Sequence, residues 1–469
     1  MAAAHHDHPQ QHHQHAAPAQ TALVPTSVLP ASLRRLFPYP HFNAMQSACF
    51  DAAYSSDASL VVAAPTGSGK TAVLSMGLAR LFGSVGTGGA QGGGGRGALA
   101  VYMAPLKALT HERLNDWKPK LQGLSVVELT GDSDDASDER AVAQADLVLT
   151  TPEKFDAFSR FRRDAQGAIG RVGLLLIDEV HTLGDPDRGA TLEAVITRLR
   201  TIGGGHDVAG MPISRLRVFA ASATVSNVED IAAWLGPATV VRRFGEEFRP
   251  VPLSWRVLTY PMAKTFMFDR LLAAKVFHVV REHASGRPSL VFCNSRKVCK
   301  EAAAQVARDA GHALVCSAEH QNHLLQAANG LSDRALAALV RCGVAYHDAS
   351  LEVGDKRAVE ALFADGALPL LCCTTGLAQG VNLPARLVVL MNTMKARRAR
   401  RARRASPRRA CASADEPRVR TCALPRARAQ YTSSSGGYEE YTRIETMQMA
   451  GRAGYRRAHG RAYPLRARS

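Results

Sequence analysis

The stretch "SLVVAAPTGSGKTAVLSMGLARLF", residues 59–82, joins a short apolar run to a glycine-rich turn and then to a helical pattern. In this context backbone N–H groups and a helix N-terminus can hold phosphates. The turn "APTGSGKT" begins with Ala64, where the general pattern G-x-x-x-x-G-K-[ST] has glycine. A chance glycine-rich turn is the weaker alternative, because strand, turn and helix agree. We therefore predict a nucleotide site in which Lys70 reaches the β- and γ-phosphates and Thr71 binds Mg²⁺.

Further apolar runs continue this pattern along the chain. They lie at residues 97–104, 145–151, 172–178, 216–224, 288–294, 343–348, 368–375 and 385–392. Short hydrophobic runs separated by helix-length segments indicate buried parallel strands in an α/β layer fold. A second series follows Pro252, and 469 residues suffice for two or three domains. We predict two tandem α/β domains, at 31–240 and 241–394, with parallel sheets flanked by helices.

Both ends of the chain differ from this body in composition. Residues 1–30 are rich in His, Gln, Ala and Pro, too polar for a core, so we expect disorder there. Residues 395–469 hold 20 Lys or Arg and 5 Asp or Glu, against 38 and 36 in the preceding residues. The net charge of +17 therefore describes an Arg-rich insert at 395–430 and a basic C-terminal tail, and it says little about the folded part.

The cysteines and the hydropathy exclude several classes of protein. Nine cysteines, odd in number and without a C-x-x-C pair, favour neither a disulfide framework nor a zinc site. No run of about 18 apolar residues occurs, and the N-terminus lacks the apolar part of a signal peptide. We therefore expect no membrane contact and a reducing compartment, the cytoplasm or the nucleus.

Two carboxylates end an apolar run in "LLLIDEVH", residues 174–181. Asp178 can hold Mg²⁺ directly or through water, and Glu179 can polarise an attacking water, as phosphoryl transfer requires. A solvated Asp-Glu pair at a strand end is the structural alternative. The phosphate loop upstream favours the catalytic interpretation.

Eleven motifs follow one another in a fixed order. They are "FNAMQ" (42–46), "APTGSGKT" (64–71), "APLKALTHER" (104–113), "TTPEKFD" (150–156), "DEVH" (178–181), "SATVSNVEDIAAWLG" (222–236), "FRPVPL" (248–253), "LVFCNSRK" (290–297), "GVAYHD" (343–348), "TTGLAQGVNLPA" (374–385) and "QMAGRAG" (448–454). This set resembles the Ski-type DExH helicases of superfamily two. Within that group, "FPYPHFNAMQSACFD" (37–51) and "DEVHTLGDPDRGATLEAVITRLR" (178–200) are most similar to the meiotic crossover DNA helicases.

The resemblance implies two RecA-like domains of the P-loop NTPase class, with ATP in the cleft and a nucleic-acid strand across their tops. The ATP residues it implies are Phe42 and Gln46 at the adenine and Ala64, Pro65, Thr66, Gly67, Ser68, Gly69, Lys70 and Thr71 at the phosphates, with Mg²⁺ on Thr71 and Asp178. The implied catalytic set is Lys70, Asp178, Glu179, His181, Gln448 and Arg452, and the implied coupling residues are Ser222 and Thr224, together with His181.

The resemblance further implies contacts with the strand backbone from Pro105, Lys107, Arg113, Thr150, Thr151, Thr374 and Thr375. Each polar member of this set has an alternative role as a cap or turn residue. Backbone phosphate contacts carry no sequence information, so no sequence preference is expected.

The last motif departs from the family pattern Q-x-x-G-R-x-G-R. In the family the second arginine reaches across the cleft to the γ-phosphate, and such an arginine is worth about 10³ to 10⁵ in rate. Tyr455 stands in its place here. Arg456 and Arg457 follow, but a shift of one residue turns a helical side chain by about 100°. Asp348 and Ser350 also replace the usual His and Gly of the family.

The insert at 395–430 separates two parts that are close together in the family, and residues 431–469 hold the last motif and the basic tail. One hypothesis is that the insert and the end after Gly454 are translated intron or shifted-frame sequence. The rival is a genuine basic loop and tail that bind nucleic acid or direct nuclear import. The chain also ends where the family adds winged-helix and ratchet domains, so ATP binding is expected more firmly than unwinding.

These patterns predict the motor core of an ATP-dependent 3′ to 5′ DNA helicase or translocase of meiotic recombination. It would act in the nucleus on single-stranded or branched DNA, with ATP and Mg²⁺, and recombination proteins are candidate partners. An RNA helicase of the same group is one alternative, since the motifs do not separate DNA from RNA. The other is a form that binds ATP and nucleic acid with impaired turnover, because Tyr455 removes the second arginine. The sequence leaves the oligomeric state open.

Overall fold

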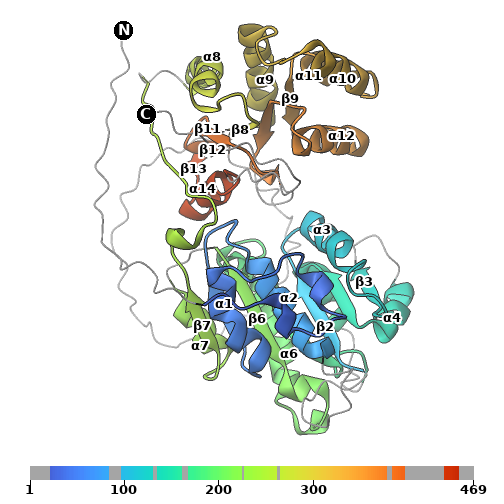
Figure 1. The fold of residues 1–469 in the computed structure, drawn as a ribbon. Coiled ribbons are helices and arrows are strands. Elements are labelled where there is room, and N and C mark those ends of the chain that lie inside the picture. The colour runs from blue at the N-terminus through green and yellow to red at the C-terminus, as the bar shows by residue number, and fades with distance from the viewer. Residues whose placement is uncertain are drawn as a thin grey trace, which may run out of the picture.

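A computed structural model describes residues 22–83, 97–129, 135–160, 167–223, 227–260, 265–377, 383–396 and 438–453. Two parallel sheets, each flanked by helices, organise these residues, and one lies above the other in Figure 1. The predicted α/β fold with parallel sheets is confirmed. The insert from residue 397, Thr224 and Tyr455 lie outside the described ranges.

The first sheet has seven parallel strands in the order β3-β4-β2-β5-β6-β1-β7. The strands are β1 (Leu60–Ala63), β2 (Leu99–Met103), β3 (Val126–Leu129), β4 (Leu147–Thr150), β5 (Val172–Ile177), β6 (Arg217–Ser222) and β7 (Val240–Arg243). Because β1 pairs with β6, the phosphate loop that follows β1 lies beside the end of β6 at the carboxyl edge of the sheet.

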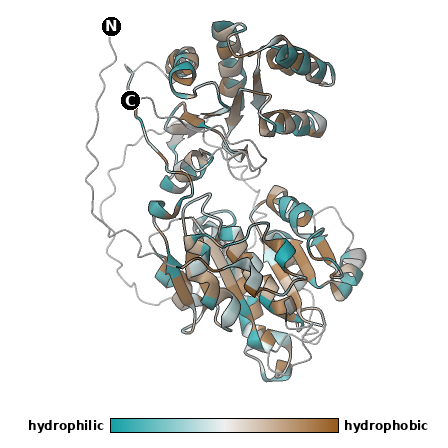
Figure 2. Ribbon diagram, in the orientation of Figure 1, coloured by the Kyte–Doolittle hydropathy of each residue, from teal (hydrophilic) through white to brown (hydrophobic). Residues whose placement is uncertain are grey.

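Helices cover both faces of this sheet. One face packs against α1 (Ala44–Phe50), α2 (Lys70–Gly83) and α3 (Lys107–Trp117). The opposite face packs against α4 (Asp135–Gln144), α5 (Pro152–Arg160), α6 (Gly189–Gly203) and α7 (Val228–Leu235). Strands buried on both faces need apolar residues at every position, and Figure 2 shows the hydrophobic colour on them.

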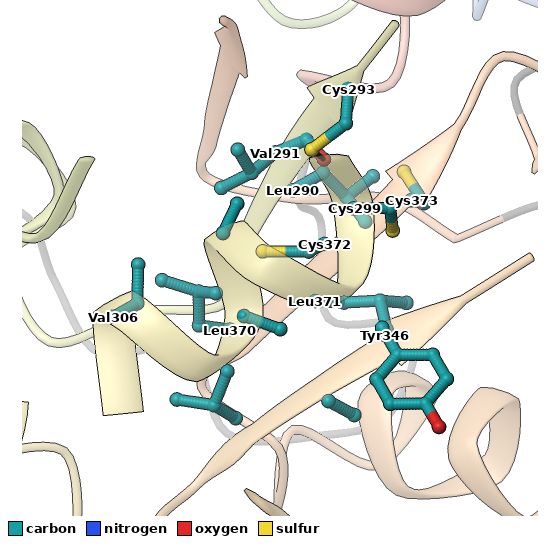
Figure 3. Packing of buried hydrophobic residues seen from close by; sticks show 14 of the residues in the cluster. Leu290, Val291, Cys293, Cys299, Val306, Tyr346, Leu370, Leu371, Cys372 and Cys373 are labelled. Carbon is teal, nitrogen blue, oxygen red and sulfur yellow. Dashed lines mark hydrogen bonds between the residues drawn. The ribbon is translucent and has the colours of Figure 1, made fainter. Parts of the chain in front are cut away.

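The second sheet has four parallel strands in the order β11-β8-β10-β9. Its elements are α8 (Thr265–His283), β8 (Ser289–Cys293), α9 (Arg296–Ala310), α10 (Ala318–Asn329), α11 (Arg334–Val340), β9 (Val344–His347), α12 (Val353–Ala364), β10 (Leu370–Thr374) and β11 (Leu387–Leu390). Side-chain caps begin three of the helices: Ser295 for α9, Ser317 for α10 and Asp333 for α11. Four cysteines of β8, α9 and β10 are free and buried in its core (Figure 3).

The last described segment returns to the second sheet. β12 (Met394–Ala396) pairs antiparallel with β13 (Tyr438–Glu440), and α14 (Arg443–Ala450) follows. Thr442 begins α14 with a capping box, in which its side chain and that of Glu445 bond each other's backbone N–H. We call each sheet with its flanking helices a unit, and α14 belongs to the second unit. Figure 1 shows α14 on the side of the second unit that faces the first sheet.

Part of the N-terminal segment expected to be disordered has a defined structure. Residues 26–28 form a short 3₁₀ helix, and Pro25 forms a bridge with His41. Leu29 is buried in the same core as Phe42, which gives this end of the segment an apolar anchor. Among the described helices, none is long and apolar enough to cross a membrane.

Candidate functional site

The phosphate loop leaves β1 and enters α2 through two glycines with left-handed backbone. Gly67 has φ +84° and Gly69 has φ +94°, a region that residues with a Cβ rarely adopt. A Cβ on Gly69 would lie 2.5 Å from Gln46 Nε2, whereas one on Gly67 would meet nothing within 4 Å. The loop is therefore closed against α1 at Gly69 and has open space at Gly67.

Lys70 begins α2 and points back under this loop. Its ammonium donates to the carbonyl oxygens of Ala64 at 2.8 Å and Pro65 at 3.1 Å. Burial lowers the pKa of Lys70, and the carboxylates of Glu179 and Asp178 oppose that shift. A buried ammonium held by two carbonyls retains a strong attraction for further negative charge.

Asp178 follows β5, and its carboxylate has two identified donors. The Tyr102 hydroxyl donates to Oδ2 at 2.9 Å, and the backbone N–H of Glu179 donates to Oδ1 at 3.1 Å. Burial raises the pKa of Asp178, the neighbouring Glu179 adds to this effect, and Tyr102 and Lys70 oppose it. Tyr102, in β2, carries no motif signal and was missed in the sequence.

Glu179 has a left-handed backbone, with φ 55°, which is uncommon for a residue with a side chain. Its Oε2 atom is buried and accepts no hydrogen bond from the described residues, although it lies 3.3 Å from His181 Nδ1. An unsatisfied buried carboxylate oxygen is costly in a folded protein. Here the cost falls on the residue expected to polarise water.

His181 joins the two units. Its Nε2 lies 3.1 Å from Gln448 Nε2 of α14, and its Nδ1 lies 3.4 Å from Ser222 Oγ at the end of β6. Burial lowers its pKa to about 4, with Lys70 adding to the shift, so the ring is neutral at pH 7. Because the Gln448 amide donates to Nε2, the ring proton lies on Nδ1, toward Ser222 and Glu179.

A second contact across the cleft involves the last motif itself. A Cβ on Gly451 would lie 2.6 Å from Thr66 Cβ, so only glycine allows this approach to the phosphate loop. Arg452 is half-buried, and the loss of solvent around it lowers its pKa, while Glu112 and Glu179 oppose that shift. Its carbonyl accepts from Ala385 N at 2.8 Å, which anchors the motif in the second unit.

The two residues expected at the adenine are both buried. Phe42 is fully buried among other aromatic rings, with Phe37 and Phe50 at centroid distances of 5.0 and 5.6 Å. Gln46 completes the capping box of α1 with Asn43 and also donates to Gly69 O at 3.2 Å. Asn43 donates to Ser68 O at 2.9 Å, a second support of the loop that the motif comparison did not single out.

A groove of about 900 Å³ lies between the two units, away from the phosphate loop. Residues of both units line it, among them Pro105, Lys107 and Thr151 of the first and Thr374 of the second. These are four of the seven residues expected to contact a strand. The others do not line it: Arg113 lies between Glu112 and Asp116, Thr150 is fully buried and Thr375 is half-buried.

The charges of the groove were only partly anticipated. Lys154, Arg188 and Lys356 line it, and none of them was among the expected strand contacts. Arg188 donates to Glu153 at 2.6 Å, and His347 lies 2.8 Å from Glu360. Sequence inspection could not find these residues, because charged positions on helices are usually solvated.

The cleft between the phosphate loop and α14 suits a nucleoside triphosphate with Mg²⁺. The open space at Gly67 gives room for a phosphate, and Lys70 supplies positive charge. Thr71, Asp178 and Glu179 provide the hydroxyl and carboxylate oxygens that Mg²⁺ prefers. Among the described residues, no group of three or more His, Cys, Asp or Glu is arranged so that it could hold a metal ion.

A phosphate loop and an Asp-Glu pair on the first sheet face a glutamine of the second unit across the cleft, an arrangement typical of the helicase class. The family model for the DEAD/DEAH box helicase matches residues 43–231, so the chain contains a helicase domain of that family. The resemblance inferred from the motifs is confirmed.

The chain is homologous to the ATP-dependent DNA helicases named MER3 and HFM1. It is 36% identical over 444 residues to the MER3 homolog of Arabidopsis thaliana and 38% identical over 445 residues to that of Oryza sativa subsp. japonica. It is 36% identical over 445 residues to the probable helicase HFM1 of Mus musculus. Each alignment covers 92% of this chain but 36%, 34% and 28% of the relatives, so the chain spans about a third of their length.

Proposed function

We propose that this chain is the motor core of an ATP-dependent DNA helicase or translocase that moves 3′ to 5′ on single-stranded or branched DNA in meiotic recombination. The contact between Gln448 and His181, at 3.1 Å, carries the proposal. This contact links the second unit to His181, which lies two positions after Glu179, the residue proposed to polarise the attacking water. A change in nucleotide state can thereby alter how the two units meet.

The nucleotide half of the mechanism uses the cleft. Lys70 would attract the β- and γ-phosphates, and Thr71 and Asp178 would hold Mg²⁺. The ion would supply positive charge against the charge that develops on the phosphates. Glu179, whose Oε2 accepts no hydrogen bond from the described residues and lies 3.3 Å from His181 Nδ1, would orient and polarise the attacking water.

The strand half uses the groove between the units. Lys107 and Thr151 on one side and Thr374 on the other would contact successive backbone phosphates. Because the two sides belong to different units, closure of the cleft changes their separation and moves the strand. We take residues 31–240 and 241–394 as the two moving domains. The names of the relatives, ATP-dependent DNA helicases, support DNA as the strand. The nucleus as the compartment and recombination proteins as partners complete the proposal.

Tyr455 supports one alternative function. If the second arginine of the last motif is indispensable, the chain binds ATP and a strand with little or no turnover. An RNA helicase is the other alternative, since a groove that contacts the backbone accepts either strand unless it reads the 2′-OH.

Steady-state ATP turnover of the whole chain, with and without single-stranded DNA or RNA, tests the proposal. We expect stimulation by DNA and a loss of at least about 10²-fold in Lys70→Ala, the order of loss typical of a phosphate-binding cation. Lys275→Ala, an exposed lysine of α8, is the matched control and should behave like the parent.

Three other outcomes would redirect the proposal. Greater stimulation by RNA would favour the RNA helicase, and turnover restored only in Tyr455→Arg would identify the impaired form. For an active parent, strand displacement from duplexes with a 3′ or a 5′ single-stranded tail tests direction. Displacement that requires a 5′ tail would contradict 3′ to 5′ movement.

A further inference from the structure

Arg249 is a buried cation that the motif comparison leaves without a role. It follows the short helix η7 (Glu246–Phe248), where the chain leaves the first sheet for the second unit, and it is 7% exposed. An arginine is almost never buried to this extent unless it is paired. Its partners therefore indicate what it does.

The bonds of Arg249 tie this crossing point to the last motif. Nη2 donates to the carbonyl of Ala453 at 2.8 Å, and Nε donates to that of Val251 at 3.3 Å. The nearest carboxylate oxygen, on the half-exposed Glu246, lies 3.8 Å from Nε, too far for a hydrogen bond. The other terminal nitrogen, Nη1, has no hydrogen-bond partner within the described ranges. The described residues therefore use only part of the hydrogen-bonding capacity of the guanidinium.

The position of Ala453 brings this cation to the nucleotide site. Ala453 lies two residues after Gly451, whose backbone packs against Thr66 of the phosphate loop. Arg249 is therefore joined, through Ala453 and Gly451, to the part of the last motif that contacts the phosphate loop. A buried cation that the described residues compensate only in part favours an anionic ligand in a neighbouring site.

We propose that Arg249 is a positioning residue of the nucleotide site, which holds the last motif against the phosphate loop through Ala453 and makes the site prefer a nucleoside triphosphate to a diphosphate. This inference rests on the proposed function of the cleft. The triphosphate carries more negative charge than the diphosphate, so a fixed cation behind the last motif favours it. Arg249 would also supply part of the positive charge that Tyr455 does not.

Equilibrium binding of fluorescent ADP and of a fluorescent non-hydrolysable ATP analogue, both with Mg²⁺, tests this role without turnover. The variants are Arg249→Gln, which removes the charge, and Arg249→Lys, which keeps it. Arg243→Gln is the control, because Arg243 is a neighbouring arginine paired with Glu229 on the surface. We expect Arg249→Gln to weaken the ATP analogue about tenfold and ADP by less than about threefold. Arg249→Lys should recover most of the preference, and the control should equal the parent.

Two results would overturn the inference. The first is an equal loss of affinity for both nucleotides in Arg249→Gln, and the second is no loss for either. A lower melting temperature of the nucleotide-free variant with an unchanged ATP to ADP ratio would likewise make Arg249 merely structural. If the parent itself binds neither nucleotide, the proposed function fails, a result distinct from these.

Discussion

The nucleotide cleft and the strand groove differ in how their charged side chains are paired. In the cleft, burial shifts the pKa of Lys70 down, that of Asp178 up and that of His181 to about 4. In the groove, Arg188 is already paired with Glu153 at 2.6 Å and Lys154 with Asp138 at 2.7 Å. The cleft therefore holds uncompensated charge that a ligand satisfies. The groove holds mostly compensated charge that a strand can exchange, which is consistent with the proposed stepwise movement along DNA.

The largest expected effect belongs to the contact between Gly451 and Thr66, where the last motif approaches the phosphate loop across the cleft. Gly451 has φ −58°, so alanine fits its backbone, but the added Cβ would lie 2.6 Å from Thr66 Cβ. Forcing an atom into a packed contact costs about 1–3 kcal/mol, which corresponds to roughly 5- to 150-fold. We expect Gly451→Ala to lower DNA-stimulated ATP turnover within that range.

The matched control for this variant is Gly354→Ala. Gly354 lies in α12, and a Cβ there would meet nothing within 4 Å. Neither substitution changes a residue that lines the groove. Parent-like turnover in Gly451→Ala would mean that the units do not need this approach for catalysis.

How far the sequence predicts the fold depends on where a strand lies in its sheet. All nine apolar runs contain strands, because central strands are buried on both faces and read as continuous hydrophobic runs. The two strands of the first sheet that were missed, β3 and β7, are its edges. Edge strands are half-exposed, and β7, "VVRR", mixes polar and apolar residues. A partly buried edge strand therefore has a hydrophobic pattern too weak to be recognised in the sequence.

In the site, residues that are close together in the sequence could be predicted, whereas residues that only the fold brings together could not. The phosphate loop and "DEVH" are contiguous, so their residues were identified from the sequence. Tyr102 lies 76 positions from Asp178, and Arg249 lies 204 positions from Ala453. Only the folded arrangement of strands and of the two units brings these pairs together. No spacing rule in a single sequence could have found them.

The pH dependence of stability tests whether His181 is buried and neutral in the folded protein. Its pKa is about 4 in the folded protein and 6.5 in its ordinary state, so between these values the unfolded chain binds more protons. The free energy of unfolding should therefore rise with pH from about 4 to 6.5, by up to about 3 kcal/mol from this residue, and its contribution should be constant above. Urea unfolding midpoints at pH 4.5, 5.5, 6.5 and 7.5 measure this slope.

A variant isolates His181 from the other titrating groups. His181→Gln keeps a polar side chain without a proton that titrates in this range. Parent and variant share the effects of Asp178 and Lys70, so the difference between their slopes reports the histidine. Equal slopes would indicate that the pKa of His181 is the same in the folded and the unfolded protein, which would contradict a buried, neutral ring.

The smallest expected effect belongs to the groove, where one charge remains without an acidic partner. Lys356 Nζ donates only to the carbonyl of Ala349, at 3.3 Å, among the described residues. A lysine that contacts one strand phosphate contributes about 0.7 to the slope of log affinity against log salt for single-stranded nucleic acid. Lys356→Ala should lower that slope by about this amount and weaken DNA binding only a few-fold at moderate salt. Lys275→Ala removes the same charge from the exposed side of α8 and should leave the slope unchanged. If both variants lower the slope equally, net charge alone attracts the strand, and the groove contributes no contact at Lys356.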